Sequence, residues 1–205
     1  PNPSPPRGEG RKNSAVSVVT PRRHWPAMAL GLLGEHQAAN AAVAVATVEL
    51  LRDAGLSLPD AAVARGLREV RWPARVELVS EMPAVVLDSA HNVPSAEALV
   101  ATLREAVPVA GRKAVVFAVS ADKPYPDILR VLAGYFDHFH LTRYGHNPRC
   151  VPPEKLATVL GPSASASVHA TAAAQAAAGP DDLVCVTGSV FLAGELRDAV
   201  RTGVY

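Results

Sequence analysis

The chain has 205 residues, of which 49% are hydrophobic, and its 20 Lys and Arg residues nearly balance its 19 Asp and Glu residues. This length can bury the core of one domain and part of a second, and the composition is that of a globular protein. The balanced charge, formally +1 at pH 7, argues against a surface for nucleic acid. Neither an apolar run of ~20 residues nor a signal-peptide pattern is found, so we expect no membrane contact and a cytoplasmic protein. We also expect a monomer.

The cysteine and histidine residues predict neither a disulfide framework nor a structural zinc site. Cys150 and Cys185 are the two cysteines, and Cys185 lies within the apolar run LVCVT, which indicates a buried thiol in a reducing compartment. Zinc sites need histidines at a characteristic spacing from cysteines or carboxylates. This spacing is not found for His24, His138, His140, His146 and His169.

The first third of the chain predicts one long helix and a shorter one after an irregular start. Residues 1–14 are rich in Pro, Gly, Ser, Asn and basic residues, and we expect a flexible linker there. Residues 15–20 (AVSVVT) have strand character. An Ala-, Val- and Leu-rich helix is predicted over 36–52, and a second helix opens at Pro59 and ends at residue 65 or 66.

A domain boundary is predicted near residues 67–72, because Pro73 disfavours helix at Trp72. It separates a first unit, 15–66, from a second unit, 67–205. In the second unit strands alternate with helices of about ten residues, which predicts an α/β fold with a mainly parallel sheet flanked by helices and right-handed crossovers. The predicted strands are 76–80, 84–87, 113–120, 138–142, 166–169 and 183–187, and the predicted helices are 95–107, 125–132, 152–160, 171–178 and 190–200.

Three polar loops follow apolar strands, at 88–92 (DSAHN), 120–123 (SADK) and 187–189 (TGS). Because the carboxyl ends of parallel strands meet at one edge of a sheet, we expect the three loops to converge on one ligand. Each loop also has an ordinary interpretation. Asn92 or Ser95 can cap the next helix while Asp88 ends a strand, and the 120–123 loop can be a simple turn.

The chain contains no glycine loop that could cradle phosphates. The run from Thr187 to Gly194 lacks the Gly-Lys-Ser/Thr ending of a P-loop, and no G-x-G-x-x-G follows a predicted strand. Since the first residue is Pro rather than Met, we expect the chain to be part of a longer protein.

Two further sets of polar residues can bind a ligand or have a purely structural role. The Arg75 guanidinium can bind phosphate in a bidentate manner, and the alternative is an exposed salt bridge worth less than about 1 kcal/mol. His36, Gln37 and Asn40 lie on one side of a helix start, where capping is the simpler interpretation.

Six short segments occur in order along the chain: LGEHQAANAA (33–42), WPARVE (72–77), LDSAHN (87–92), DK (122–123), NPR (147–149) and VTGS (186–189). Together they resemble the later part of folylpolyglutamate synthase / dihydrofolate synthase, a member of the Mur-ligase superfamily, and the resemblance covers roughly residues 15–200. The family usually has the patterns W-P-G-R-L-E and D-G-A-H-N-P. This chain has Ala74 and Val76 in the first and Ser89 and Val93 in the second, so the ionisable residues are kept.

The resemblance implies an ATP-dependent amide ligase with ATP, L-glutamate and a folate-type substrate as partners and Mg²⁺ as cofactor. ATP would phosphorylate a carboxylate of the folate substrate, and the amino group of glutamate would attack the acyl phosphate. Residues 15–66 would be the tail of a central ATP-binding domain and 67–205 a C-terminal Rossmann-like domain. The P-loop and the main magnesium ligands would lie in an upstream domain, so we expect this chain alone to be inactive.

The resemblance also assigns roles to individual residues. His91 would be catalytic and lie near the nucleotide. Arg75 would contact the ATP phosphates, Asp88 the ribose, and Asn92 would support the loop at the ATP site. The adenine side would be formed by His36, Gln37 and Asn40, and the incoming glutamate would be held by Lys123 and Ser189.

Two other functions remain open at the level of sequence. One is a noncatalytic nucleotide-binding or interaction module that has lost its P-loop partner. The other is a cell-wall Mur ligase acting on a nucleotide-linked sugar. The choice between dihydropteroate and folates that already carry glutamate also remains open.

Overall fold

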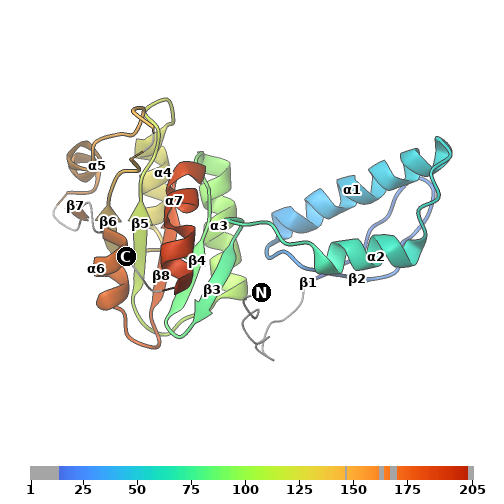
Figure 1. The fold of residues 1–205 in the computed structure, drawn as a ribbon, viewed down its shortest axis with the longest axis horizontal. Helices are drawn as coiled ribbons and strands as arrows, with labels where there is room; N and C mark the ends of the chain where they lie inside the picture. Colours follow the sequence, from blue (N-terminus) through green and yellow to red (C-terminus); the bar gives the residue numbers. More distant parts are fainter. Residues whose placement is uncertain (1–13, 146, 162–163, 167–169, 203–205) are drawn as a thin grey trace. The chain divides into compact units, whose positions relative to one another are not determined.

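The computed structural model describes residues 14–145, 147–161, 164–166 and 170–202, and the chain divides into two compact units, Pro1–Arg71 and Trp72–Tyr205 (Figure 1). The division falls at the end of the 67–72 segment rather than at residue 66, because the second helix of unit 1 continues to Glu69 and Leu67 packs against the core of that unit. Residues 1–13 of the expected linker lie outside the described residues.

Unit 1 consists of a two-stranded antiparallel sheet and two helices. Strand β1 (Ser14–Val16) pairs with β2 (Met28–Leu30), and helices α1 (Glu35–Asp53) and α2 (Asp60–Glu69) follow. The predicted strand at 15–20 is thus shorter and starts earlier, and β2 was missed because three residues carry almost no periodic signal. The core is formed by Val16, Val18, Trp25, Met28, Leu30, Ala41 and Val45.

Helix α1 buries only a narrow stripe at positions four residues apart, Gln37, Ala41, Val45 and Glu49. Its outer face is nevertheless apolar, and Val43 is 67% exposed. A helix that is apolar on most of its circumference is typical of one packed on several sides.

Unit 2 is built on a six-stranded sheet of order β3-β4-β8-β5-β6-β7. Every pairing is parallel except that of β3 with β4, which confirms the predicted mainly parallel α/β fold. The strands are β3 (Glu77–Glu81), β4 (Ala84–Leu87), β5 (Lys113–Phe117), β6 (His138–Leu141), β7 (Ala164–Ala166) and β8 (Leu183–Thr187), and the helices are α3 (Val93–Ala106), α4 (Tyr125–Ala133), α5 (Pro153–Leu160), α6 (Ala170–Ala176) and α7 (Val190–Thr202).

The predicted elements agree with the observed ones to within a few residues at each end. Strand β3 begins at Glu77 instead of Val76, because Val76 has a positive φ of 46° and is not extended. Helix α3 begins two residues before the predicted Ser95, since its cap is Asn92. The last three residues of the strand predicted at 166–169 lie outside the described residues.

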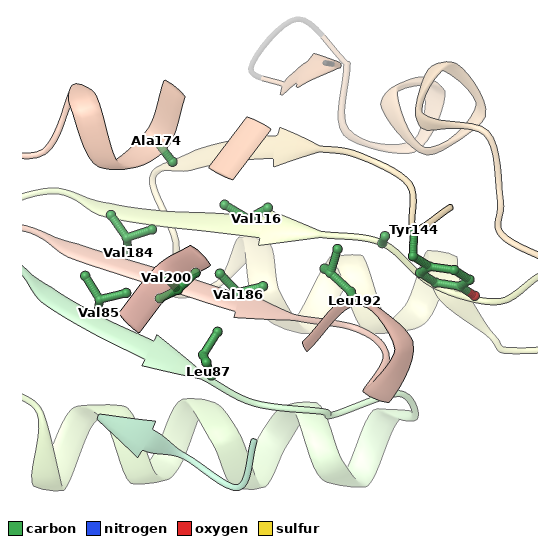
Figure 2. Close-up of a cluster of buried hydrophobic side chains, with 10 residues drawn as sticks. Val85, Leu87, Val116, Tyr144, Ala174, Val184, Val186, Leu192 and Val200 are labelled. Atoms are coloured by element: carbon green, nitrogen blue, oxygen red, sulfur yellow. The ribbon is translucent and has the colours of Figure 1, made fainter. Parts of the chain in front are cut away.

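Helices cover both faces of the sheet, α6 and α7 on one and α3 and α4 on the other (Figure 1). Figure 2 shows alternate residues of the central strands, such as Val184 and Val186, beside Leu192 and Val200 of α7. The intervening residues, such as Cys185, point to the opposite face, so each central strand is buried on both sides and is apolar throughout.

Cys185 is a free, fully buried thiol, as predicted. Burial, together with the nearby Asp88 carboxylate, raises the pKa of this thiol well above its usual range. In the part of the chain that the structure describes, no helix is long and apolar enough to cross a membrane.

Strand β8, the last in the sequence, is inserted between β4 and β5. The chain therefore runs from β4 outward through β5, β6 and β7 and then returns to the middle of the sheet. Such a reversal of strand order is a topological switch point, where open α/β sheets bind ligands at the carboxyl ends of the strands. The loops that follow β4, β5 and β8 are the three polar loops singled out in the sequence.

Candidate active site

A pocket of about 370 Å³ lies at the carboxyl ends of these strands, within the ~300–1,000 Å³ range typical of small-molecule sites. The predicted convergence of the three loops is confirmed, because each contributes to its lining. Two further segments contribute Arg75, from the residues before β3, and Arg149, from the connection between β6 and α5. The lining residues are Arg75, Ser89, His91, Ser120, Asp122, Lys123, Arg149, Gly188, Ser189, Val190 and Phe191.

Four of the predicted site residues meet in this pocket, namely Arg75, His91, Lys123 and Ser189. Two others, Asp88 and Asn92, belong to the loop after β4 but do not line it. The remaining three, His36, Gln37 and Asn40, lie in unit 1.

The Arg75 side chain is exposed and makes no hydrogen bond or ion pair with any residue that the structure describes. The alternative interpretation, an exposed salt bridge, therefore does not hold here. Glu77, the nearest carboxylate in sequence, instead pairs with Arg197 of α7. Arg75 is thus a cation at the pocket with its full hydrogen-bonding capacity available to a ligand.

Asp88 joins three segments around the pocket, and its side chain is buried. Its Oδ2 accepts a hydrogen bond from the Val76 N–H at 3.0 Å, and its Oδ1 accepts one from the Ala90 N–H at 2.6 Å. The Thr187 hydroxyl also donates to Oδ1, at 3.4 Å. Asp88 therefore does more than end a strand. The ribose contact implied by the resemblance stays a prediction.

His91 is oriented by its own loop. Its Nδ1 lies 3.0 Å from the Ser89 carbonyl oxygen. Because a carbonyl only accepts, Nδ1 must carry the proton, and the neutral ring then offers Nε2 as an acceptor. No hydrogen bond of Nε2 occurs among the described residues, so this nitrogen is available to a ligand in the pocket.

Asn92 is the N-cap of α3. Its Oδ1 accepts from the Ser95 N–H at 2.9 Å, while Ser95 Oγ accepts from the Asn92 N–H at 3.1 Å, so the two form a reciprocal capping box. The capping alternative is therefore confirmed for Asn92. This cap fixes the end of the loop that carries His91, and a direct contact of Asn92 with ATP stays a prediction.

Lys123 and Asp122 form an ion pair, with Nζ 3.1 Å from Oδ2. The hydrogen bond from Lys123 lowers the pKa of the Asp122 carboxyl, which is therefore ionised. Both side chains are partly exposed, so the pair is weak and Lys123 can exchange this partner for an anionic ligand.

Ser189 stands at the N-terminus of α7, and its buried Oγ accepts a hydrogen bond from the Phe191 N–H at 3.1 Å. Its hydroxyl proton remains to be donated to a ligand. The preceding Gly188 has φ of 105°, and a Cβ there would lie 2.4 Å from the Ala118 carbonyl oxygen. Only glycine fits this turn, which brings the positive end of the α7 dipole to the pocket.

Arg149 was not predicted as a site residue, although its motif, Asn-Pro-Arg at 147–149, is one of the six segments of the resemblance. The Ala121 N–H donates to the Arg149 carbonyl oxygen at 2.7 Å, which ties this loop to the loop after β5. The Tyr144 hydroxyl lies 2.6 Å from Ser120 Oγ and makes a second tie. An arginine shortly after a predicted strand, at the same edge as the other loops, is the signal that could have identified it.

His36, Gln37 and Asn40 form a chain of side-chain contacts at the start of α1. Gln37 Nε2 lies 3.1 Å from His36 Nε2, and Asn40 Nδ2 donates to Gln37 Oε1 at 3.1 Å. The capping interpretation is wrong for these residues, because the N-cap is Gly34 and no side chain caps the helix. Their predicted place at the adenine stays a prediction.

The pocket carries a positive charge excess. Three cationic side chains, Arg75, Lys123 and Arg149, face a single carboxylate, Asp122, and the α7 N-terminus adds to the positive potential. Such a site favours anions, and phosphate or carboxylate groups are the ligands that arginine binds best. No group of three or more His, Cys, Asp or Glu residues that could hold a metal ion occurs within the described ranges.

Comparison with known proteins identifies similar chains in other organisms. The chain is 27% identical over 194 residues to a dihydrofolate synthase/folylpolyglutamate synthase of Bacillus subtilis, covering 90% of this chain and 44% of that protein. Escherichia coli FolC in complex with ADP superposes with a TM-score of 0.78 at 29% identity, covering 90% of this chain and 44% of that one. A bifunctional folylpolyglutamate synthase/dihydrofolate synthase of Yersinia pestis, complexed with AMPPNP and Mn, superposes with a TM-score of 0.75 at 28% identity. This match covers 88% of this chain and 42% of that one.

The chain thus spans less than half the length of these relatives. The family model described as "Mur ligase, glutamate ligase domain" matches residues 74–190, which is more than half of the chain and lies entirely within unit 2. This match contains every residue of the pocket up to Val190, and the chain therefore belongs to the Mur ligase family through its glutamate ligase domain.

Proposed function

We propose that unit 2 supplies half of the active site of an ATP-dependent ligase that adds L-glutamate to a folate-type substrate. The observation that carries this proposal is the gathering of Arg75, Lys123 and Arg149 with the α7 N-terminus in one pocket of a glutamate ligase domain. Relatives with this domain are named for folate ligation, and two similar structures contain an adenine nucleotide.

Both anions of this reaction suit the pocket. On the β4 side, Arg75 would neutralise the phosphates of ATP and of the acyl phosphate. On the β5 and β8 side, Lys123 and Arg149 would bind the carboxylates of glutamate, to which Ser189 donates its hydroxyl proton. Phosphoryl transfer depends mainly on positioning and charge neutralisation, which side chains of this kind provide.

His91 would act on the amine that attacks the acyl phosphate. The glutamate ammonium must lose a proton before its nitrogen can attack, and His91 Nε2 is an acceptor whose ring is fixed through Nδ1. The Nδ1 hydrogen bond to the Ser89 carbonyl leaves Nε2 as the nitrogen that would take the proton.

We propose that the main ligands of the divalent metal of such a ligase lie in the P-loop region of the intact protein. Asp122, the single carboxylate at the pocket, is paired with Lys123 and is therefore a poor metal ligand by itself. Magnesium would neutralise charge on the ATP phosphates when bound. We assign no step on this chain to the metal.

The test uses the intact ligase, by which we mean this chain joined to the P-loop region that we propose for the rest of the protein. With ATP, glutamate and dihydropteroate or tetrahydrofolate, it should form ADP and a glutamylated folate, whereas the 205-residue chain alone should not. Turnover by the isolated chain would contradict the half-site proposal. Nucleotide binding without ligation would favour a noncatalytic module, and ligation only to a nucleotide-linked sugar would favour a cell-wall enzyme.

Lys123→Met tests the glutamate side of the pocket. Loss of a charge-assisted contact worth about 1.5–3 kcal/mol should raise KM for glutamate by about 10- to 100-fold and leave KM for ATP within about twofold. The control is Lys155→Met on α5, an exposed lysine outside the pocket. An equal effect of Lys123→Met on both KM values would contradict the assignment.

A further inference from the structure

Ala74 and Val76, the two neighbours of Arg75, adopt a backbone conformation that their side chains disfavour. Ala74 has φ of 53° and Val76 has φ of 46°, and both are buried. A left-handed φ is uncommon for any residue with a Cβ and is a clear outlier for a β-branched one such as valine. Each such residue costs on the order of 1–3 kcal/mol, so neighbouring groups must hold the segment in place.

Two carboxylates hold this segment, each through the backbone N–H of one neighbour of Arg75. Glu77 Oε2 accepts a hydrogen bond from the Ala74 N–H at 3.0 Å, and Asp88 Oδ2 accepts one from the Val76 N–H at 3.0 Å. Both neighbours of Arg75 are thus fixed and buried, while Arg75 itself is exposed at the pocket. The strained backbone therefore fixes the point from which the Arg75 side chain leaves the chain at the pocket.

Glu77 is held in turn by a residue 120 positions away. Arg197 of α7 donates through Nη2 to Glu77 Oε1 at 2.7 Å and through Nε to Oε2 at 3.1 Å. Partial burial opposes ionisation of Glu77, but the hydrogen bonds from Arg197 and the Ala74 N–H prevail and lower the pKa of this carboxyl. The Glu77–Arg197 pair is therefore ionic and bidentate, which is the strongest form of such a contact.

Helix α7 consequently acts on the pocket at two points. Its first residues, Val190 and Phe191, line the pocket, and Arg197 lies about two turns further along. The same rigid element thus presents its own N-terminus to an anion and fixes, through Glu77, the segment that carries Arg75.

We propose that Glu77 and Arg197 are positioning residues that act through Arg75, by holding Ala74 in the left-handed conformation and so fixing where the Arg75 side chain leaves the backbone toward an anionic group of the substrates. This inference rests on the proposed function, since it assigns Arg75 a ligand. Without the pair, Ala74 can relax to negative φ, and Arg75 must then be ordered at each binding event, which weakens binding.

A double-mutant cycle in the intact ligase tests the inference. Arg197→Met removes the charge but keeps the length of the stem, and it should lower kcat/KM for ATP about tenfold, whereas Arg197→Lys should restore part of the loss. In an Arg75→Ala background, Arg197→Met should change kcat/KM less than twofold, because the residue through which it acts is gone. Arg130→Met on α4, which breaks an exposed pair with Asp127, is the matched control.

A second readout does not depend on the substrates. Amide hydrogen exchange at Ala74, whose N–H is bound by Glu77, should be faster in Arg197→Met than in the parent and unchanged in Arg130→Met. The variant Ala74→Gly lowers the cost of the left-handed conformation, so adding it to Arg197→Met should recover part of kcat/KM. If Arg197→Met does not fold, Glu77→Gln provides the same comparison.

Unchanged exchange at Ala74 would overturn the inference, and so would a loss of activity that is equally large with and without Arg75. If Arg75→Ala alone retains full activity, the proposed role of Arg75 fails and the positioning role fails with it. Failure of the Arg75 role can be distinguished from failure of the anchoring by Arg197, because amide exchange at Ala74 would still report whether Arg197 holds the segment.

Discussion

Asp88 and His91 are three residues apart in one loop, yet their surroundings give them different roles. Asp88 is buried and accepts hydrogen bonds from three different segments of unit 2. His91 lines the pocket, and among the described residues its ring makes one hydrogen bond, to the Ser89 carbonyl. Substitutions at these neighbours should therefore have separable effects.

His91→Ala should lower kcat of the intact ligase by about 10²- to 10⁴-fold, the range for loss of a general base, and change the free energy of unfolding by less than about 0.5 kcal/mol. Asp88→Ala should instead reduce both the activity and the free energy of unfolding. The free energy of unfolding should fall by about 2–4 kcal/mol, because the substitution leaves buried N–H groups without acceptors. Steady-state kinetics and urea unfolding measure the two effects. A His91→Ala protein with parental kcat would show that the imidazole is only part of the loop structure.

Asp182 anchors the opposite, amino edge of the sheet. It accepts hydrogen bonds from the backbone N–H groups of Gly179 and Arg112 and pairs with the Arg112 side chain. These contacts, the Gly179 hydrogen bond first, lower the pKa of the Asp182 carboxyl. A lowered pKa means that the native state favours the ionised form, so this stabilisation is present above the unfolded pKa of about 3.9 and is lost as the pH falls through the lower native value.

The urea midpoint of unit 2 should therefore decrease as the pH is lowered from 5 to 2, and Asp182→Asn should make the decrease shallower. The measurement is urea unfolding at several pH values, with Asp198→Asn on the exposed side of α7 as control. If the urea midpoints of Asp182→Asn and the parent fall equally steeply as the pH is lowered, ionised Asp182 is not the source of this stabilisation.

Helix α7 is the element on which the pocket depends most. The turn before it requires Gly188, because this residue has a positive φ and lies against β5. Further along the helix, Gly194 has open space at its Cβ position and ordinary helical geometry. The two glycines form a natural pair for comparison.

Gly188→Ala should destabilise the chain by more than about 2 kcal/mol, because the added methyl group meets the Ala118 carbonyl and the Phe117 ring. Gly194→Ala should stabilise it by roughly 0.5–1 kcal/mol through helix propensity. Thermal and urea unfolding of both variants give the comparison. If Gly188→Ala leaves the free energy of unfolding unchanged, the turn can relax, and the fold does not require the close approach of residue 188 to the end of β5.

At the scale of the whole chain, the two units differ in how complete their cores are. Unit 2 closes both faces of its sheet with helices (Figure 1), and a cluster of buried apolar side chains fills the space between the sheet and α7 (Figure 2). Unit 1 leaves Val43, Leu50 and Leu51 of α1 exposed. An apolar helix face of this kind is expected to be covered by further protein.

Residues 72–205 expressed alone should therefore unfold in one cooperative transition, whereas residues 14–71 alone should not. Circular dichroism melting of the two pieces tests this, with the 205-residue chain as reference. A cooperative transition for residues 14–71 would show that unit 1 is a complete domain and would remove the need for a covering partner on α1.

Local sequence signals located most of the elements, the three polar loops at the pocket and Arg75, but gave no role to Arg149. Apolar runs interrupted by Pro and Gly mark the strands and helices, and the parallel-sheet rule brings the ends of β4, β5 and β8 to one edge. The short strand β2 and the positive φ of Val76 escaped this reasoning, because neither leaves a periodic signal in the sequence.

Residue types and their order thus determined the α/β class, the polar loops and the cationic character of Arg75 and Lys123. Only the tertiary structure decided the central place of β8, the contribution of Arg149 to the pocket, and the pairing of Glu77 with Arg197. The physical reason is sequence distance. A hydrogen bond or ion pair between residues 120 positions apart forms only when the whole sheet has assembled, and no local pattern records which partner each charge will meet.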